Sequence, residues 1–332
     1  MDRTVSARRR PPGAWLAQST RDCMRLGGRS VVSITLAVGF VVALFVWGDR
    51  ELALAVLQEA SLPALAGGLL LLLASYGARC LRLAITLRLS GAAAHWRLVR
   101  LALVHNALVN LLPMRGGDLA FPLLLRRTFA IPLAEGAALI LWLRLQDVVV
   151  LLTLTVLFWP GLPWLLRVLA LGAALLLAAR LPMWLRRALG WVPRRLRLRA
   201  ARALRLALAR GSREVLTWSW TTVNWLLKFV AAAALLSAFG VMPPEVALAG
   251  AAAGEAAALL PVQGVAGIGT YEGAIIGALA LHGVELQWAL AAAVAAHATM
   301  LATALAAAAL ISLFAPGDPA ALDERTRTQP IR

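Results

Sequence analysis

Cysteine, histidine and lysine are scarce in this chain, and their scarcity limits the chemistry that it can perform. The 332 residues include two cysteines, four histidines and a single lysine, Lys228. Cys23 lies in a basic segment and Cys80 follows an arginine, so we expect both on the reducing side of a membrane and predict no disulfide. The histidines are far apart, at positions 95, 105, 282 and 297, and none has the spacing of metal ligands. We therefore predict neither a metal site nor a cofactor.

Charged residues are also few, and they lie in clusters between apolar stretches. Only 15% of residues are charged and 61% are hydrophobic, more apolar surface than one globular core can bury. The net charge of +17 would suit a nucleic-acid partner, but the arginines gather in residues 3–29, 79–100 and 180–213, as the positive-inside rule predicts for cytoplasmic loops. We predict an all-α, multi-pass protein of the bacterial inner membrane, with both termini in the cytoplasm and no nucleic-acid partner.

Six apolar stretches approach the roughly 20 residues that a membrane-spanning helix needs. We predict a basic cytoplasmic tail at residues 1–30, a transmembrane domain at 31–314 and a disordered tail at 315–332. Within the domain, residues 180–213 alternate arginine with apolar residues, which indicates an amphipathic cytoplasmic loop. This loop either anchors the topology or recognises an anionic lipid. The predicted spans are Val31–Trp47, Leu62–Leu81, Ala137–Phe158, Leu162–Ala179, Val215–Phe239 and Trp288–Phe314.

Two further apolar segments are short and broken by proline and glycine. Arg97–Leu112 ends at Pro113, and Val246–Leu260 ends at Pro261. If all the arginine clusters are cytoplasmic, the number of membrane crossings fits only when each of these two segments leaves the membrane on the side where it entered. We therefore predict two re-entrant helical hairpins that enter from opposite faces, in an inverted-repeat arrangement typical of transporters.

Ionisable residues inside a membrane are costly, so each needs a partner or a function. Arg144 and Asp147 have the spacing of an intrahelical ion pair, whose role is either structural or functional. Glu272 opens a helix, and capping alone could explain it. We predict that Lys228 faces a cavity, where Arg115, Arg144 and Lys228 together could hold a phosphate. The candidate site residues are Asn110, Arg115, Gly117, Asp118, Arg127, Arg144, Asp147, Lys228, Glu255, Gln263, Gly267, Gly269 and Glu272.

Two segments resemble the signature regions of a known membrane family. They are NLLPMRGGDLAFPLLLRR, at residues 110–127, and ALLPVQGVAGIGTYEG, at residues 258–273. They resemble the flippase-like family, also called the lysylphosphatidylglycerol synthase transmembrane-region family. The resemblance extends to about residue 314 and implies that a lipid moves between leaflets. The family motifs correspond to Pro113, Arg115, Gly117, Asp118, Arg127, Arg144, Asp147, Glu255, Pro261, Gly267, Gly269 and Glu272.

The chain departs from the family pattern at some of these motifs. Asp118 lies where the family more often has glutamate, and Phe121 lies where arginine is frequent. Trp142 and Leu143 replace a common acidic residue. The resemblance therefore leaves the lipid headgroup open, and we expect an anionic or isoprenoid-type lipid as the partner.

The family's synthase chemistry belongs to a soluble domain that follows the membrane part. After Phe314 this sequence has only a short polar segment, so we expect a lipid flippase or lipid transporter and no enzyme. The alternative is a non-catalytic scaffold that recruits a lipid-biosynthesis enzyme as its partner.

Overall fold

The computed structural model describes residues 28–112, 116–191, 193, 201, 204, 212–240, 242–260 and 263–313. In these residues it contains eleven α-helices, two short 3₁₀ helices and no strand, which confirms the all-α prediction. The α-helices are α2 (Gly28–Trp47), α3 (Arg50–Gln58), α4 (Leu62–Leu87), α5 (Ala92–Leu111), α6 (Gly116–Phe129), α7 (Leu133–Phe158), α8 (Trp164–Ala188), α10 (Ser212–Ala238), α11 (Pro244–Ala257), α12 (Thr270–Leu281) and α13 (Leu286–Leu313), and the 3₁₀ helices are η2 (Leu189–Trp191) and η3 (Val265–Gly267).

Five of the helices in the described residues are long and apolar enough to cross a membrane. They are α4, α7, α8, α10 and α13, and each contains most or all of one predicted span. The remaining predicted span, Val31–Trp47, falls in α2, where the apolar stretch is shorter and covers Ile34–Leu44. The sixth crossing therefore stays a prediction. The short helix α3, which Asp49 caps by accepting hydrogen bonds from two backbone N–H groups, was not predicted.

Two helices extend beyond the predicted spans. Helix α4 continues from the predicted end at Leu81 to Leu87, so both Arg79 and Arg82 lie on a helix inside the protein, whereas the arginine cluster that begins at residue 79 predicts a cytoplasmic loop. Polar groups on neighbouring helices offset the cost of burying them. Helix α8 continues to Ala188 and takes up the start of the predicted amphipathic segment at 180–213. Most of residues 192–211, residues 1–27 of the predicted tail at 1–30, and the predicted tail at 315–332 lie outside the described residues.

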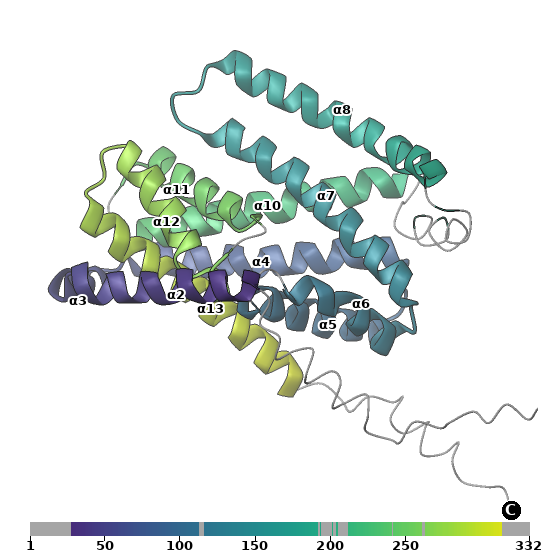
Figure 1. Ribbon diagram of the computed structural model, residues 1–332, viewed down its shortest axis with the longest axis horizontal. Helices are drawn as coiled ribbons and strands as arrows, with labels where there is room; N and C mark the ends of the chain where they lie inside the picture. Colours follow the sequence, from purple (N-terminus) through teal and green to yellow (C-terminus); the bar gives the residue numbers. More distant parts are fainter. Residues whose placement is uncertain are drawn as a thin grey trace, which may run out of the picture.

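Helices α4 and α10 form the centre of the bundle and run antiparallel (Figure 1). The backbone N–H of Ser61, just before α4, donates to the carbonyl of Ala238, at the end of α10, over 2.9 Å. Gly68 allows the two helices to approach closely, since a Cβ there would lie 2.9 Å from the Leu235 side chain. Small residues at such contacts are the usual way in which membrane helices pack.

Two helical hairpins leave this central pair from opposite ends. Helices α5 and α6 fold back on each other, with Gly117 against the backbone of Val109, and they follow the C-terminal end of α4. Helices α11 and α12 do the same, with Gly254 against Tyr271, and they follow the C-terminal end of α10. Because α4 and α10 are antiparallel, the hairpins lie at opposite ends, to the right and left in Figure 1.

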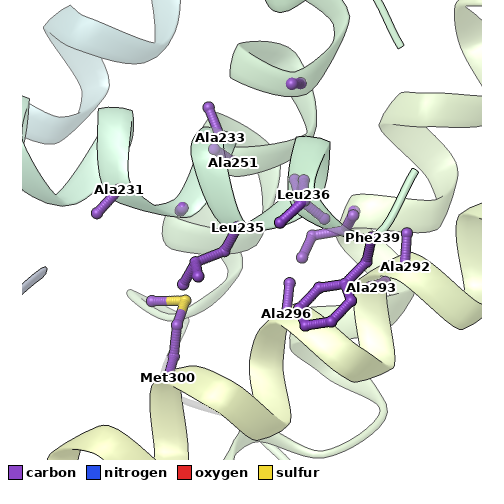
Figure 2. Close-up of a cluster of buried hydrophobic side chains, with 14 of the residues drawn as sticks. Ala231, Ala233, Leu235, Leu236, Phe239, Ala251, Ala292, Ala293, Ala296 and Met300 are labelled. Carbon is purple, nitrogen blue, oxygen red and sulfur yellow. The ribbon is translucent and has the colours of Figure 1, made fainter. Parts of the chain in front are cut away.

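Each hairpin packs against the last long helix of the other half. Helix α5 contacts α13, and α11 contacts α7, so the halves α4–α7 and α10–α13 interlock. The largest hydrophobic core joins α10 to α13 and is rich in alanine: Leu235 and Phe239 lie against Ala293, Ala296 and Met300 (Figure 2). The short alanine side chains bring the backbones together and position the polar residues that follow.

Candidate functional site

A polar cavity lies between the two halves, bordered by the end of α5 and the loop around η3. Its water-accessible volume is about 100 Å³. Helices α4, α7, α10, α11, α12 and α13 supply the rest of its wall. Seven predicted site residues line it, although they come from six different elements: Asn110, Arg144, Asp147, Lys228, Glu255, Gln263 and Gly267.

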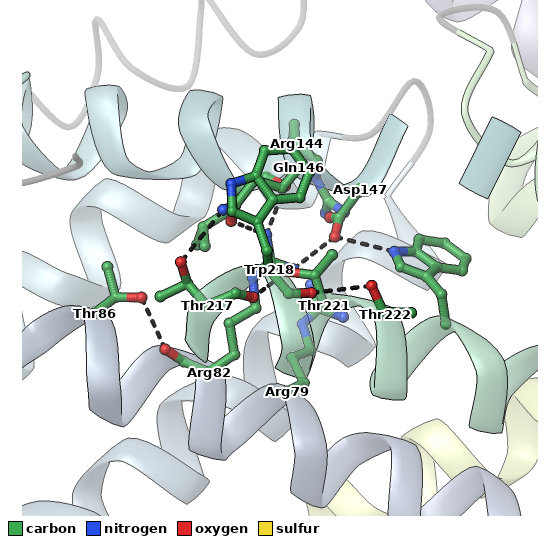
Figure 3. A network of polar contacts seen from close by, with 12 residues as sticks. Arg79, Arg82, Thr86, Arg144, Gln146, Asp147, Thr217, Trp218, Thr221 and Thr222 are labelled. Carbon is green, nitrogen blue, oxygen red and sulfur yellow. Dashed lines mark hydrogen bonds and ion pairs between the residues drawn. The ribbon is translucent and has the colours of Figure 1, made fainter. Parts of the chain in front are cut away.

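Asp147 is the centre of a buried network on the side formed by α4 and α7. One carboxylate oxygen accepts from Arg82 over 2.6 Å and from the Trp225 indole over 3.1 Å (Figure 3). The other oxygen accepts from Arg144 over 3.1 Å, so the ion pair predicted from their spacing is present. Arg144 also binds Asp118 through two nitrogens, at 2.9 and 2.5 Å. Each of these charges is therefore neutralised by a direct partner.

Lys228 and Glu255 form the corresponding pair on the side of α10 and α11. The lysine Nζ lies 2.6 Å from a Glu255 carboxylate oxygen, and the glutamate is fully buried. The Tyr271 hydroxyl donates to the other oxygen over 3.1 Å. Lys228 also lies 5.2 Å from the centre of the Trp225 ring, a cation–π distance. Lys228 therefore faces the cavity, as predicted, but its charge is paired.

Glu272 has two partners, of which one was predicted. It accepts from the backbone N–H of Gly269 over 2.7 Å, which is the capping contact at the start of α12. Gly269 has a φ of +85° and packs against α2, a conformation and a space that suit glycine. The other carboxylate oxygen of Glu272 lies 2.7 Å from Nδ1 of His297, whose ring lines the cavity. The histidine partner was not predicted.

Arg79 is a cavity cation without a carboxylate partner in the described residues. It donates to the Asn106 side-chain oxygen over 2.9 Å, and no described carboxylate lies within ion-pair distance of it. Asn106 is only 8% exposed, and its side-chain nitrogen has no hydrogen-bond partner in the described part of the chain. A guanidinium and an unpaired amide donor thus meet at the wall of the same cavity.

The remaining predicted residues have other positions. Arg115 falls outside the described residues, as do Pro113 and Pro261. Arg127 is exposed at the end of α6 and does not line the cavity. Gly117 packs the hairpin, because a Cβ there would lie 2.3 Å from the Val109 nitrogen. In the predicted phosphate trio, Arg144 and Lys228 are bound by carboxylates and Arg115 lies outside the described residues, so the trio stays a prediction.

The sequence contains a signal that could have identified Arg79. Lys228 and Glu255 are 27 residues apart, and so are Arg79 and Asn106. Each pair joins the first helix of one half to the first arm of its hairpin. An inverted repeat predicts such matched spacings, so a search for a cation 27 residues before a polar residue would have found both pairs.

Comparison with known protein families agrees with this architecture. The family model described as "Lysylphosphatidylglycerol synthase TM region" matches residues 31–308 of the chain. The chain belongs to this family. No curated protein and no solved structure matches it. Membership confirms the resemblance carried by the two signature segments and identifies a multi-pass membrane protein of a family concerned with lipids.

Proposed function

We propose that this protein moves a lipid with an anionic headgroup between the leaflets of the bacterial inner membrane. The cavity between the hairpins is the headgroup site, and the acyl chains stay in the surrounding lipid. The observation that carries the proposal is that Arg79 lines the cavity beside the Asn106 amide and has no carboxylate partner in the described residues.

The charges around Arg79 favour an anionic ligand. In the described residues, the half formed by α4–α7 presents Arg79, Arg82 and Arg144 against Asp118 and Asp147, so one positive charge is left over. A cation at membrane depth without a counter-charge is costly. The oxygens of a phosphate suit a planar guanidinium, and charge-assisted hydrogen bonds of this kind are the strong ones. Binding the headgroup would give Arg79 the direct anionic partner that it lacks among the described residues.

The hairpins support movement across the membrane as well as binding. They leave the α4–α10 pair from opposite ends, and their breaks border the same cavity. In inverted-repeat transporters such broken helices form a central site that opens to either side in turn. The carboxylates of the site are engaged in ion pairs rather than free for acid–base chemistry, which favours a transporter over an enzyme.

A flipping assay with purified protein tests this proposal. Proteoliposomes would contain short-chain fluorescent phosphatidylglycerol or, for comparison, phosphatidylcholine, and dithionite would report the probe that has moved to the outer leaflet. We expect the anionic probe to move faster and Arg79→Gln to abolish the difference. Competition by unlabelled farnesyl phosphate would indicate an isoprenoid phosphate as the substrate. Folded protein that moves none of these lipids would refute the proposal and favour a scaffold, to be sought by cross-linking a lipid-biosynthesis enzyme.

Labelling of single cysteines tests the topology. In a background without Cys23 and Cys80, Ser90→Cys and Leu133→Cys flank the first hairpin, while Glu245→Cys and Glu285→Cys flank the second; all four positions are exposed. An impermeant thiol reagent should reach the first two from one side and the last two from the other. Labelling of either hairpin's two flanks from different sides would exclude a re-entrant hairpin.

A further inference from the structure

The two halves contain matching ion pairs that differ in one chemical respect. In the first half Asp118, the third residue of α6, binds Arg144 on α7, 26 residues later. In the second half Glu272, the third residue of α12, contacts His297 on α13, 25 residues later. Each pair ties the second arm of a hairpin to the next long helix. The cation of the first pair is an arginine, and its counterpart in the second pair is a histidine.

This difference decides whether the pair can change charge. Arginine keeps its proton at any physiological pH, whereas histidine titrates in the physiological range. His297 and Glu272 are only 7% and 4% exposed, and the histidine ring lies 4.3 Å from the Tyr271 ring. Nδ1 of His297 lies 2.7 Å from a Glu272 carboxylate oxygen, so this carboxylate is the direct partner of the ring. The first pair is a permanent link, and the second is able to gain and lose a proton.

We propose that His297, held by Glu272, is a proton-binding site and that an anionic headgroup enters the cavity together with a proton bound there. Lipid movement would then be coupled to protons. This inference rests on the proposed function, because it assigns the coupling ion to the same cavity.

The charges of the second half give the direction of the coupling. Among the described residues of that half, Lys228 is paired with Glu255 and Glu272 contacts His297, so one negative charge is left over while His297 is neutral. That negative charge offsets the excess positive charge of Arg79. Protonation of His297 cancels it and leaves the cavity positive, which favours an anion. By reciprocity, a bound anion favours the protonated histidine, so lipid affinity should rise as the pH falls.

The other charged groups around His297 are arginines or are held by strong partners. Glu255 is bound by Lys228 and Tyr271, and the arginines stay charged. His105 is buried beside Asp118 in the first half and is the competing candidate. The ionisable side chains that contact His297 or share the cavity wall with it in the described residues are Tyr76, Arg79 and Arg82 of α4, Arg144 and Asp147 of α7, Lys228 of α10, Glu255 of α11, and Tyr271 and Glu272 of α12; α5 contributes the neutral Asn106 and Asn110.

The test compares flipping of fluorescent phosphatidylglycerol at about pH 6 and pH 8, with the same pH on both sides of the membrane. We expect the wild-type protein to be about tenfold faster at the lower pH, a typical size for coupling between two sites. His297→Arg should be active at both values with little difference between them, and His297→Gln should be slow at both. His95→Gln is the matched control, because this exposed histidine on α5 hydrogen-bonds the Gly91 carbonyl and is not among the residues that line the cavity, and it should keep the wild-type ratio.

The outcomes separate this inference from the proposed function. Wild-type protein that moves the probe at equal rates at both pH values overturns the proton site and leaves the lipid transporter intact. A pH ratio that persists in His297→Gln and disappears in His105→Gln also overturns it. Failure to move any lipid at either pH refutes the proposed function itself. Size-exclusion elution and thermal unfolding establish that each variant is folded, and His297→Gln decides the question if His297→Arg does not fold.

Discussion

Replacement of Arg79 and of Arg82 by glutamine should have opposite consequences, although the two arginines lie three residues apart on α4. Both line the cavity. Arg82 is bound to a buried carboxylate, whereas Arg79 has only the Asn106 amide as a partner in the described residues. We expect Arg82→Gln to destabilise the protein, and Arg79→Gln to leave it stable but unable to select an anionic lipid.

The size of the destabilisation expected for Arg82→Gln follows from the contact between Arg82 and Asp147. The two side chains are 4% and 7% exposed and lie 2.6 Å apart. Removing one partner of a buried ion pair costs about 3–5 kcal/mol, since the other charge is left uncompensated. Asp147 would still accept from Arg144 and Trp225, so we expect the lower end of this range, about 3 kcal/mol.

Arg79→Gln should have a small effect on stability and a large effect on transport. A glutamine at this position can still donate to Asn106, so the loss of stability should be below about 1 kcal/mol. Loss of a charge-assisted contact to a phosphate costs about 1.5–3 kcal/mol, which corresponds to roughly 10- to 150-fold in affinity. Flipping of the anionic probe at low lipid concentration should fall by a similar factor.

Two measurements on the same preparations check this reasoning. Tryptophan fluorescence during heating reports stability, and the proteoliposome assay reports flipping. The control is Arg88→Gln, an exposed arginine at the end of the same helix, which should change neither quantity. Wild-type flipping by Arg79→Gln, or equal destabilisation by the two cavity variants, would refute the division between a ligand-binding and a structural arginine.

Packing and pairing elsewhere give two further predictions. Gly117→Ala should destabilise the first hairpin by about 1–3 kcal/mol, because the added Cβ would lie 2.3 Å from a backbone atom. Gly273→Ala places its Cβ in open space and should be neutral or slightly stabilising. Thermal unfolding would distinguish the two variants, and equal effects would contradict the close packing at Gly117. Lys228→Ala should lower the free energy of unfolding by about 3–5 kcal/mol, because it leaves Glu255 unpaired. Adding Glu255→Gln should restore most of this stability. A double-mutant cycle that shows no coupling between the two residues would disprove the pairing.

Several features of the fold and site could be predicted from the sequence because they depend on local patterns. Apolar length predicted five long helices, and the proline and glycine breaks located both hairpins. The spacing of Arg144 and Asp147 predicted their ion pair, and the position of Glu272 predicted its capping contact. Each of these inferences uses residues within a few turns of one another, where helix geometry alone sets the distances.

The partners across helices could not be predicted in this way. Arg79 and Arg82 belong to an arginine cluster that the positive-inside rule assigns to a loop, and only packing against α5 and α7 brings them into the bundle. His297 was set aside because it lies far from the other histidines in sequence, yet its partner is a carboxylate on the neighbouring helix. Such contacts depend on which helix faces are turned inward, and hydropathy does not determine this where a helix is apolar on all sides.

The sequence by itself determined that this is a helical membrane protein with two broken segments at matching places, since apolar length and backbone breaks are local properties. Its similarity to a family model placed it in a lipid-related family. Only the tertiary structure decided which charges are neutralised and which remain available. Burial makes each charge depend on its nearest counter-charge, and the antiparallel packing of α4 on α10 brings Arg79, Lys228 and His297 to the wall of one cavity from helices up to 200 residues apart in the chain.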